Sequence, residues 1–238
     1  MSANKSRRYR EAANLVEKGR QYPFEEAVSH ARKLATARFD ETLELAIKLG
    51  IDPRRSDQLV RGTVALPHGT GRTVRVLVFA RGAAEEEARS AGAEFVGFDE
   101  LVEKIKGGWT DFDVAVTTPD LMREVARLGK ILGPRGLMPS PKTGTVTKDV
   151  AGTVKEVKAG KIEFRTDKQA NVHVPFGKAS FDEEKLVENG LAILDALLKA
   201  KPSGAKGQYI KKCCISATMG PGIELDMKDV TEKLQGRR

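Results

Sequence analysis

Residues 129–146, GKILGPRGLMPSPKTGTV, combine glycines and prolines with cations and hydroxyl groups and contain no acid. Glycine-rich loops that carry a Lys-Thr pair can hold phosphate groups through backbone amides, while the lysine reaches outward. Here Lys142 follows Pro141, which has no amide hydrogen, and the segment comes after an expected helix rather than a strand. The loop cations Lys130, Arg135 and Lys142 therefore leave three interpretations open: a rigid connector, a contact to a nucleic-acid backbone, or a nucleotide site.

The other residues with catalytic or metal-binding chemistry form no recognisable pattern. The only cysteines, Cys213 and Cys214, are adjacent, and neighbouring cysteines cannot readily form a disulfide without distorting the peptide between them. The histidines lack the spacing of a zinc site: His30, His68 and His173. The segment FARGAAEEEARSAG lacks the G-x-G-x-x-G fingerprint and places three acids where a pyrophosphate would lie. We expect no metal, no cofactor and no enzymatic activity.

The charge of the chain points to a polyanionic partner. The formal net charge is +8 at pH 7, and clustered Lys and Arg side chains gain affinity for nucleic acid by releasing its condensed counterions. No run of about 18 apolar residues is present that could cross a membrane, and the N-terminal segment lacks the apolar core of a signal peptide. We expect a cytoplasmic protein with no membrane partner.

The two ends of the chain share a mixed helix and strand pattern. FEEAVSHARKLA (24–35) has apolar residues at helical spacing, with acids early and cations late, as the helix dipole prefers. RFDETLELAIKLGID then alternates apolar and polar side chains, which is typical of a strand with one buried face. The later segments predict, in order, a hairpin of KIEFRT and NVHVPF, a long leucine-rich helix at 182–201, a strand at 207–220 and a frayed polar tail, KDVTEKLQGRR.

The middle of the chain alternates short apolar runs with helical segments. VRVLVFA, AEFVGF and FDVAVTTP are separated by AAEEEARSAG and DELVEKIKGG and followed by DLMREVARLG, which is typical of a parallel, Rossmann-like layer. We predict a discontinuous α+β domain with an antiparallel sheet, residues 1–67 plus 160–238, interrupted by an inserted Rossmann-like three-layer α/β domain, residues 68–159. The split domain carries a net charge of +7 and the insert +1. Nucleic acid should therefore bind the split domain.

Several stretches resemble the bacterial-type large-subunit ribosomal protein L-one family, in order and at its spacing. They are ATARFDETLELAIKLGIDPRRSDQLVRGTVALPHGTG, GKILGPRGLMP, KAGKIEFRTDK, GKASF and TMGPG. The resemblance implies two domains joined by a hinge, and binding of the stalk region of large-subunit ribosomal RNA mainly by the split domain. It also implies release of deacylated tRNA from the exit site, repression of the protein's own operon mRNA, contacts with other ribosomal components, and a monomer off the ribosome.

By position, the resemblance carries over a set of rRNA contacts: Arg38, Phe39, Thr42, Glu44, Asp167, Lys168, Thr218, Met219 and Gly220. Arg38 and Lys168 can contact phosphates, and Phe39 can lie against a ribose or a base. Threonine hydroxyls can exchange hydrogen bonds with 2′-hydroxyl groups. Gly220 is expected where two backbones approach closely. Each residue keeps an ordinary interpretation as well, with Phe39 in the core, Met219 in packing, and Thr42 and Glu44 on a solvated strand face.

The hinge candidates are Pro67, His68, Gly69, Gly71, Ala159 and Gly160, and Lys130, Arg135 and Lys142 are candidates for the tRNA side. Two other functions remain open. A nucleotide-dependent enzyme would bind ATP or NAD through residues 68–159. A purely electrostatic nucleic-acid binder would show a steep salt dependence with little preference among RNA structures.

Overall fold

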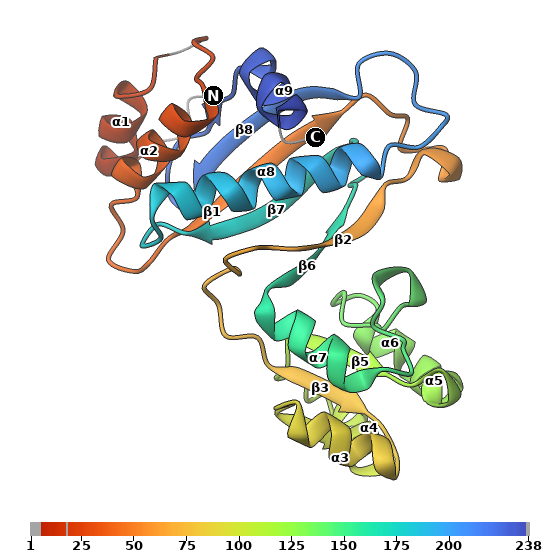
Figure 1. Cartoon of the computed structure of the whole chain (residues 1–238). Helices are drawn as coiled ribbons and strands as arrows, with labels where there is room; N and C mark the ends of the chain where they lie inside the picture. The colour runs from red at the N-terminus through yellow and green to blue at the C-terminus, as the bar shows by residue number, and fades with distance from the viewer. Residues whose placement is uncertain (1–5, 18, 237–238) are drawn as a thin grey trace. The chain divides into compact units, whose positions relative to one another are not determined.

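The computed structural model describes residues 6–17 and 19–236, and the chain divides into two compact units (Figure 1). The split unit contains both ends of the chain, residues 1–71 and 163–238, and the inserted unit is the intervening segment, 72–162. Both boundaries lie a few residues later in the sequence than the expected 67/68 and 159/160.

The split unit is built on a four-stranded antiparallel sheet with the strand order β7-β1-β8-β9. The strands are β7 (Asn171–Lys178), β1 (Thr42–Leu49), β8 (Ile210–Ala217) and β9 (Ile223–Glu224). Every second side chain of β1 from Leu43 to Leu49 is buried, as the alternating pattern predicts. Leu45 lies opposite Val174 on one side and Ile215 on the other, so three strands contribute to one apolar face.

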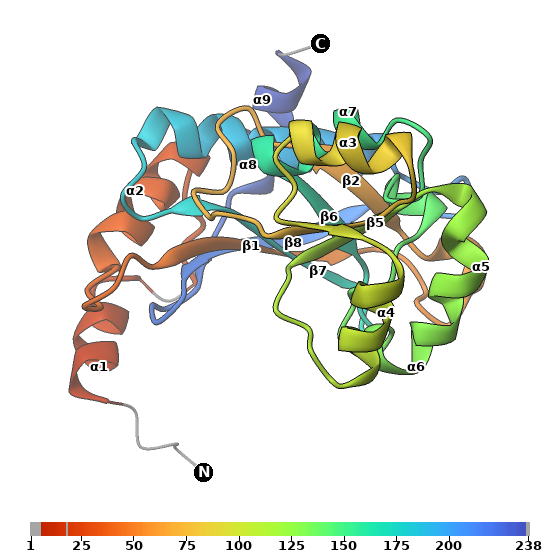
Figure 2. The ribbon, with the colours of Figure 1, turned by 90° about the horizontal axis from the view of Figure 1, so that it is seen from below.

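Helices cover the apolar face of this sheet. α2 (Phe24–Leu34) and α8 (Glu183–Lys199) pack against each other on the same side of the strands (Figure 2), and α1 (Arg7–Asn14) precedes them. Gly190 of α8 permits the close packing, because a Cβ there would lie 2.5 Å from Cζ of Phe24. The leucines of α8, a helix that the sequence predicted, are buried except for Leu198, which is partly exposed.

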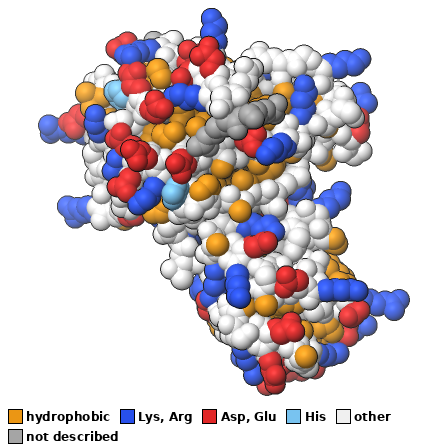
Figure 3. Space-filling model, viewed as in Figure 1, with side chains coloured by type: hydrophobic (Ala, Val, Ile, Leu, Met, Phe, Trp, Pro, Cys, Tyr) orange, Lys and Arg blue, Asp and Glu red, His pale blue; other side chains and the backbone are white. Residues whose placement is uncertain are grey.

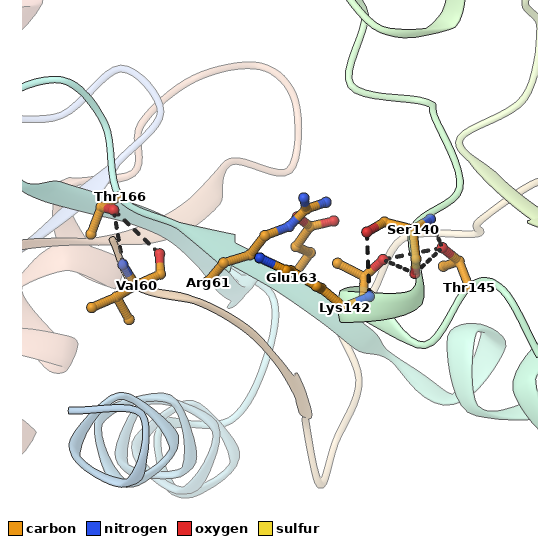
Figure 4. A network of polar contacts seen from close by, with 8 residues as sticks. Val60, Arg61, Ser140, Lys142, Thr145, Glu163 and Thr166 are labelled. Atoms are coloured by element: carbon orange, nitrogen blue, oxygen red, sulfur yellow. Dashed lines mark hydrogen bonds and ion pairs between the residues drawn. The ribbon is translucent and has the colours of Figure 1, made fainter. Parts of the chain in front are cut away.

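A two-stranded sheet pairs β2 (Arg61–Ala65) with β6 (Lys161–Arg165). The expected hairpin of β6 and β7 is therefore wrong in its pairing, since β7 pairs with β1, and the described residues join the two segments through the bridge Thr166–Val172. Thr166 explains why β6 pairs with β2 instead of β7. Its N–H donates to the carbonyl of Val60 at 3.0 Å, and its hydroxyl also bonds to that residue (Figure 4). A short helical turn, η1 (Ser56–Gln58), precedes β2.

The inserted unit holds a parallel sheet with the strand order β4-β3-β5. Its strands are β3 (Val76–Phe79), β4 (Phe95–Gly97) and β5 (Val114–Thr117). Val76 and Val78 belong to an apolar cluster shared with α3 (Ala83–Ser90) and α7 (Val150–Ala159). Leu77 and Phe79 belong to a second cluster, shared with α4 (Asp99–Lys106) and the segment after β5. Helices thus cover both faces of the sheet.

The segment DLMREVARLG is not the continuous helix that its periodicity predicts. It forms short successive pieces, η2 (Pro119–Leu121), α5 (Met122–Val125), η3 (Ala126–Leu128) and α6 (Gly129–Leu132). Leu121, Val125, Leu128 and Leu132 are nevertheless all buried in the second cluster. The apolar spacing of a helix is kept, while the backbone alternates between 3₁₀ and α geometry.

The C-terminal segment is an ordered helix and not the frayed tail we expected. α9 (Met227–Gln235) buries Val230 and Leu234, which lie one turn apart. The side chain of Asp226 accepts the backbone N–H of Lys228 and caps the helix start. The many charged residues of this segment conceal a short apolar stripe, and this stripe supplies the burial that the helix needs. Arg237 and Arg238 lie outside the described residues.

Candidate nucleic-acid interface

The residues expected to contact rRNA fall into two groups at opposite ends of β1. At its start, Thr42 pairs with Thr218, and segments 38–39 and 219–220 adjoin them. At its end, the N–H of Leu49 donates to the carbonyl of Ala170, in the turn that contains the second group. At ~3.3 Å per residue the two ends of the strand are roughly 23 Å apart.

Thr42 and Thr218 close the first end of the sheet through reciprocal bonds. The N–H of Thr218 donates to the Thr42 carbonyl at 3.0 Å, and the N–H of Thr42 donates to Thr218 Oγ1 at 3.0 Å. The Thr218 hydroxyl also donates to the Thr42 carbonyl at 3.2 Å, and Thr42 Oγ1 accepts from Lys178 Nζ at 2.9 Å. Thr218 Oγ1 therefore keeps one lone pair, and Thr42 Oγ1 keeps its proton. Together the two hydroxyls can accept from and donate to a 2′-hydroxyl group.

A buried carboxylate that was not among the expected site residues organises this end. Glu41 is 1% exposed, and its oxygens accept the N–H groups of Ala37 at 2.8 Å and Met219 at 2.9 Å. Its carbonyl accepts the N–H of Ala179 at 2.8 Å. One residue thus ties together the segment before β1 and the turns after β7 and β8. The sequence does carry a signal for it, because Glu41 has the same parity as the buried Leu43 and points inward with it.

Two large apolar side chains are exposed beside this anchor. Phe39 is 56% exposed and Met219 50% exposed, so neither occupies the core position that an ordinary packing interpretation required. Arg38 is also exposed. Gly220 differs from expectation, since a Cβ there would lie 3.3 Å from the Ala217 Cβ and its nearest neighbour is a side chain rather than a second backbone. We call Arg38, Phe39, Thr42, Thr218 and Met219 the proximal cluster.

The second group is an acid-organised turn. Asp167 accepts the N–H groups of Gln169 at 2.8 Å and Asn171 at 2.7 Å, and the Asn171 side-chain amide at 3.1 Å. The hydrogen bond from the Asn171 backbone is the main reason that the pKa of Asp167 lies below its usual value. Ala170 closes the turn with a φ of 61°. Asp167 is thus exposed but bonded within the turn, and the neighbouring Lys168 is an exposed cation.

Glu44 lies on the open face of the sheet, away from the helices and between the two groups. It is exposed, and its cross-strand neighbours are Ser216 and Pro175. Cys214 lies on the same face, whereas Cys213 points into the core, and burial raises the pKa of the Cys213 thiol. A thiol that resists ionisation is a weak nucleophile.

The first hinge candidates are anchored within the split unit by a second buried polar residue that the sequence did not reveal. Asn189 of α8 is fully buried, and its Oδ1 accepts the N–H of His68 at 3.1 Å. Its Nδ2 donates to the carbonyls of Gly69 and Phe176, both at 2.9 Å. The His68 ring also lies 2.6 Å from a carboxylate oxygen of Glu188.

The other hinge candidates occupy turns. Pro67 begins the turn that Gly69 closes on the Leu66 carbonyl. Gly71 has a φ of 68°, and a Cβ there would lie 2.8 Å from the ring of Phe181. In the inserted unit, Ala159 ends α7 and Gly160 caps it with a φ of 107°.

The glycine- and proline-rich loop of the inserted unit, within residues 129–146, is closed on itself. It contains η4 (Pro141–Thr143), and Figure 4 shows its polar contacts converging on Ser140. The Ser140 N–H donates to Thr145 Oγ1 at 2.8 Å, and the Ser140 carbonyl accepts the hydroxyl of Thr143 at 3.0 Å. The N–H of Lys142 donates to Ser140 Oγ at 3.3 Å. Amides that are bonded inside the loop do not form a phosphate cradle, so the loop geometry favours a rigid connector. Its cations Lys130, Arg135 and Lys142 are exposed.

Two other kinds of site are absent from the described ranges. Among residues 6–17 and 19–236, no three His, Cys, Asp or Glu side chains gather as a metal ion would require. No helix of the same residues is long and apolar enough to span a bilayer.

Comparison with known proteins relates this chain to proteins of the large ribosomal subunit. Residues 31–221, which contain every expected rRNA contact, match the Ribosomal protein L1p/L10e family. The chain is 57% identical over 228 residues to the large ribosomal subunit protein uL1 of Kosmotoga olearia, covering 96% of this chain and 99% of that protein. It is 61% identical over 221 residues to the large ribosomal subunit protein uL1 of Beutenbergia cavernae, covering 93% of each.

Proposed function

Because the chain belongs to the ribosomal protein L1p/L10e family, we propose that the proximal cluster is its specific binding surface for large-subunit ribosomal RNA. The protein is a constituent of the large ribosomal subunit and resides in the cytoplasm on the ribosome. The observation that supports the proposal is the pair of exposed side chains, Phe39 and Met219, held beside two threonine hydroxyls by the buried Glu41. Such a surface is ordered before RNA arrives, which lowers the entropy cost of binding.

The chemistry of the proximal cluster suits RNA rather than an arbitrary polyanion. Phe39 offers an aromatic face on which a base or ribose can lie, and the threonine hydroxyls can bond to the 2′-hydroxyl that distinguishes RNA from DNA. Arg38 supplies a phosphate contact. Glu44, on the open face, repels phosphate unless it accepts bonds from a 2′-hydroxyl or a base amine, so it favours discrimination over affinity.

We assign further roles to the same protein on the strength of the family. The inserted unit would meet exit-site tRNA through Lys130, Arg135 and Lys142 and assist its release, while the two units change orientation about segments 67–71 and 159–160. An mRNA structure that resembles the rRNA site would compete for the proximal cluster and repress translation of the protein's own operon. The split unit would be the rRNA-binding domain, the protein would be a monomer off the ribosome, and none of these roles requires catalysis.

Binding of the full chain to the stalk element of large-subunit rRNA tests the main proposal, with an unrelated hairpin of equal length as competitor. Phe39→Ala should weaken specific binding by ~1–3 kcal/mol, the range for stacking of one base on an aromatic side chain. Leu59→Ala is the matched control, since Leu59 is 48% exposed and lies outside the proximal cluster. Equal affinity of Phe39→Ala and wild type would remove Phe39 from the site, and equal affinity of wild type for both RNAs would refute specific recognition.

A change in the orientation of the two units needs its own measurement. Small-angle scattering of the full chain, free and with tRNA or rRNA, should give different distance distributions if the two units reorient. A single distribution under all conditions would contradict the hinge.

A further inference from the structure

Three loops of the split unit meet at the end of β1 that is far from the proximal cluster. Segment 50–58 follows β1, segment 200–209 precedes β8, and the turn 167–170 joins β6 to β7 (Figure 1). The N–H of Gly50 donates to the carbonyl of Tyr209 at 2.6 Å. A Cβ on Gly50 would lie 2.2 Å from the Gln208 carbonyl oxygen, so this junction requires glycine.

A buried glutamine fixes two of these loops to each other. Gln58 is 9% exposed, and its Oε1 accepts the N–H of Asp52 at 2.8 Å while its Nε2 lies 3.4 Å from the carbonyl of Gly204. The third loop joins through β1, because Lys48 donates to the carbonyl of Gln169. The side chains on these loops therefore project from anchored backbone.

The three loops and the start of β8 carry exposed cations that form no ion pair with the described residues. Five exposed side chains share this property: Arg54, Lys168, Lys201, Lys206 and Lys211. Among the residues that the structure describes, none of the five has a carboxylate within ion-pair distance; Lys201 instead lies 5.9 Å from the centroid of the Tyr209 ring. We call these five residues the distal platform. Lys and Arg side chains project from the corresponding edge of the unit in Figure 3.

The acids near the distal platform are occupied by local donors. Asp52 Oδ1 accepts the backbone N–H of Arg54 at 3.0 Å, and Asp57 pairs with Arg55 at 3.1 Å. Asp167 accepts three hydrogen bonds inside its own turn. Local acids therefore shape the loops without neutralising the five cations.

We propose that the distal platform binds the phosphate backbone of RNA and is a second contact site, separate from the proximal cluster. This inference rests on the proposed rRNA binding and adds a role for Arg54, Lys201, Lys206 and Lys211 beside that of Lys168. Unpaired lysines on a fixed frame suit a ligand whose charges repeat and whose sequence does not matter. Lys168 makes the distal platform continuous with the rRNA contacts already expected on the split unit.

The salt dependence of binding separates this role from recognition. Removal of one phosphate-binding cation should make the plot of log K against log salt shallower by ~0.7 for single-stranded and ~0.9 for duplex nucleic acid. We would compare the full-length wild type with Lys206→Ala/Lys211→Ala, using the stalk rRNA element and the unrelated hairpin at four salt concentrations. The slope should become shallower by ~1.4–1.8 for both RNAs, and the preference for the stalk element should stay unchanged. The control Lys185→Ala/Lys228→Ala removes the same charge from exposed positions of α8 and α9 and should leave the slope as it is.

Each outcome decides the proposal. An unchanged slope in the platform variant, or an equal change in the control, would overturn it, because the effect would then be absent or due to net charge alone. Loss of preference in the platform variant would also overturn it, since the lysines would then read RNA structure. If wild type shows no preference between the two RNAs, specific rRNA recognition fails, while the slope difference between the variants still tests the distal platform.

Discussion

Removal of the Glu41 carboxylate should destabilise the two loops that carry the proximal cluster, although the buried Glu41 itself cannot touch RNA. Its two oxygens accept the N–H groups of Ala37 and Met219 at 2.8 and 2.9 Å in a site that is 1% exposed. A hydrogen bond to a charged group contributes ~1.5–3 kcal/mol, so the removal of two in Glu41→Ala should cost about 3 kcal/mol or more of local stability. Glu41→Gln keeps one acceptor oxygen and should lose about half as much.

Hydrogen exchange of these two amides, followed by NMR, measures this effect directly. In Glu41→Ala the N–H groups of Ala37 and Met219 should exchange at least a hundredfold faster, because each 1.4 kcal/mol corresponds to a factor of ten in an equilibrium constant. Binding to the stalk rRNA element should weaken at the same time. The control is Asp40→Ala, the exposed neighbour whose carboxylate bonds to Ser180. Wild-type exchange rates with weakened RNA binding would refute the reasoning, since Glu41 would then act on RNA without ordering the loops.

Three further predictions concern polar groups with defined surroundings. Asn189→Ala leaves the N–H of His68 and two carbonyls without their partner and should destabilise the split unit by ~2–4 kcal/mol in chemical denaturation. Glu188→Ala removes only a partly exposed contact with the His68 ring and should cost less than ~1 kcal/mol. Hydrogen bonds hold the pKa of Asp167 below its ordinary value of 3.8. Asp167 therefore stabilises the turn above that pH, and this stabilisation is lost as the pH falls through the lower folded pKa. The NMR shift of the Gln169 amide should follow this loss, and Asp167→Asn should abolish the pH dependence. Burial raises the pKa of Tyr209 from 10.0 to about 12. The contribution of the neutral Tyr209 to folding stability is therefore complete below pH 10 and is lost as the pH rises toward 12. A phenolate absorbance step near pH 12 that is missing in Tyr209→Phe would confirm the assignment, and a step near pH 10 would contradict it.

The spacing of apolar residues located most helices and strands. It failed where contacts with residues distant in sequence determined the strand pairing or the helix. The alternation in β1 and the apolar spacing in α2 are visible because each element buries one continuous face. The hairpin prediction holds only at its turn, where Thr166 forms an antiparallel bridge with Val172. It fails along the strands because β6 pairs with β2, and Thr166 bonds to Val60, which is far away in sequence. α9 was missed because its helix depends on burying two apolar side chains, Val230 and Leu234, among many charges.

The exposed residues of the candidate site could be predicted from the sequence, but the buried residues that position its loops could not. Phe39, Met219 and Lys168 were named from the resemblance to a family, and all three are exposed, as a surface that binds RNA requires. Glu41 and Asn189 work by bonding to backbone groups, and such bonds leave no motif in a single sequence. A charged residue that continues the buried parity of a strand, as Glu41 does ahead of Leu43, is a signal worth testing in other chains.

The two ends of β1 differ in chemistry, so the proximal cluster should supply structural specificity for RNA and the distal platform should supply electrostatic affinity. The proximal cluster offers two hydroxyls, two large apolar side chains and one cation, and only the cation gains from counterion release. The distal platform offers five cations whose nearby acids are already engaged, so its contribution should fall steeply as salt rises. Because one strand joins the two surfaces, the spacing of roughly 23 Å between them is set by the sheet rather than by a flexible loop. An RNA that reaches both ends at this spacing is recognised by the proximal cluster and gains affinity from the distal platform. An RNA that reaches only the distal platform binds through its phosphates, without discrimination among RNA structures.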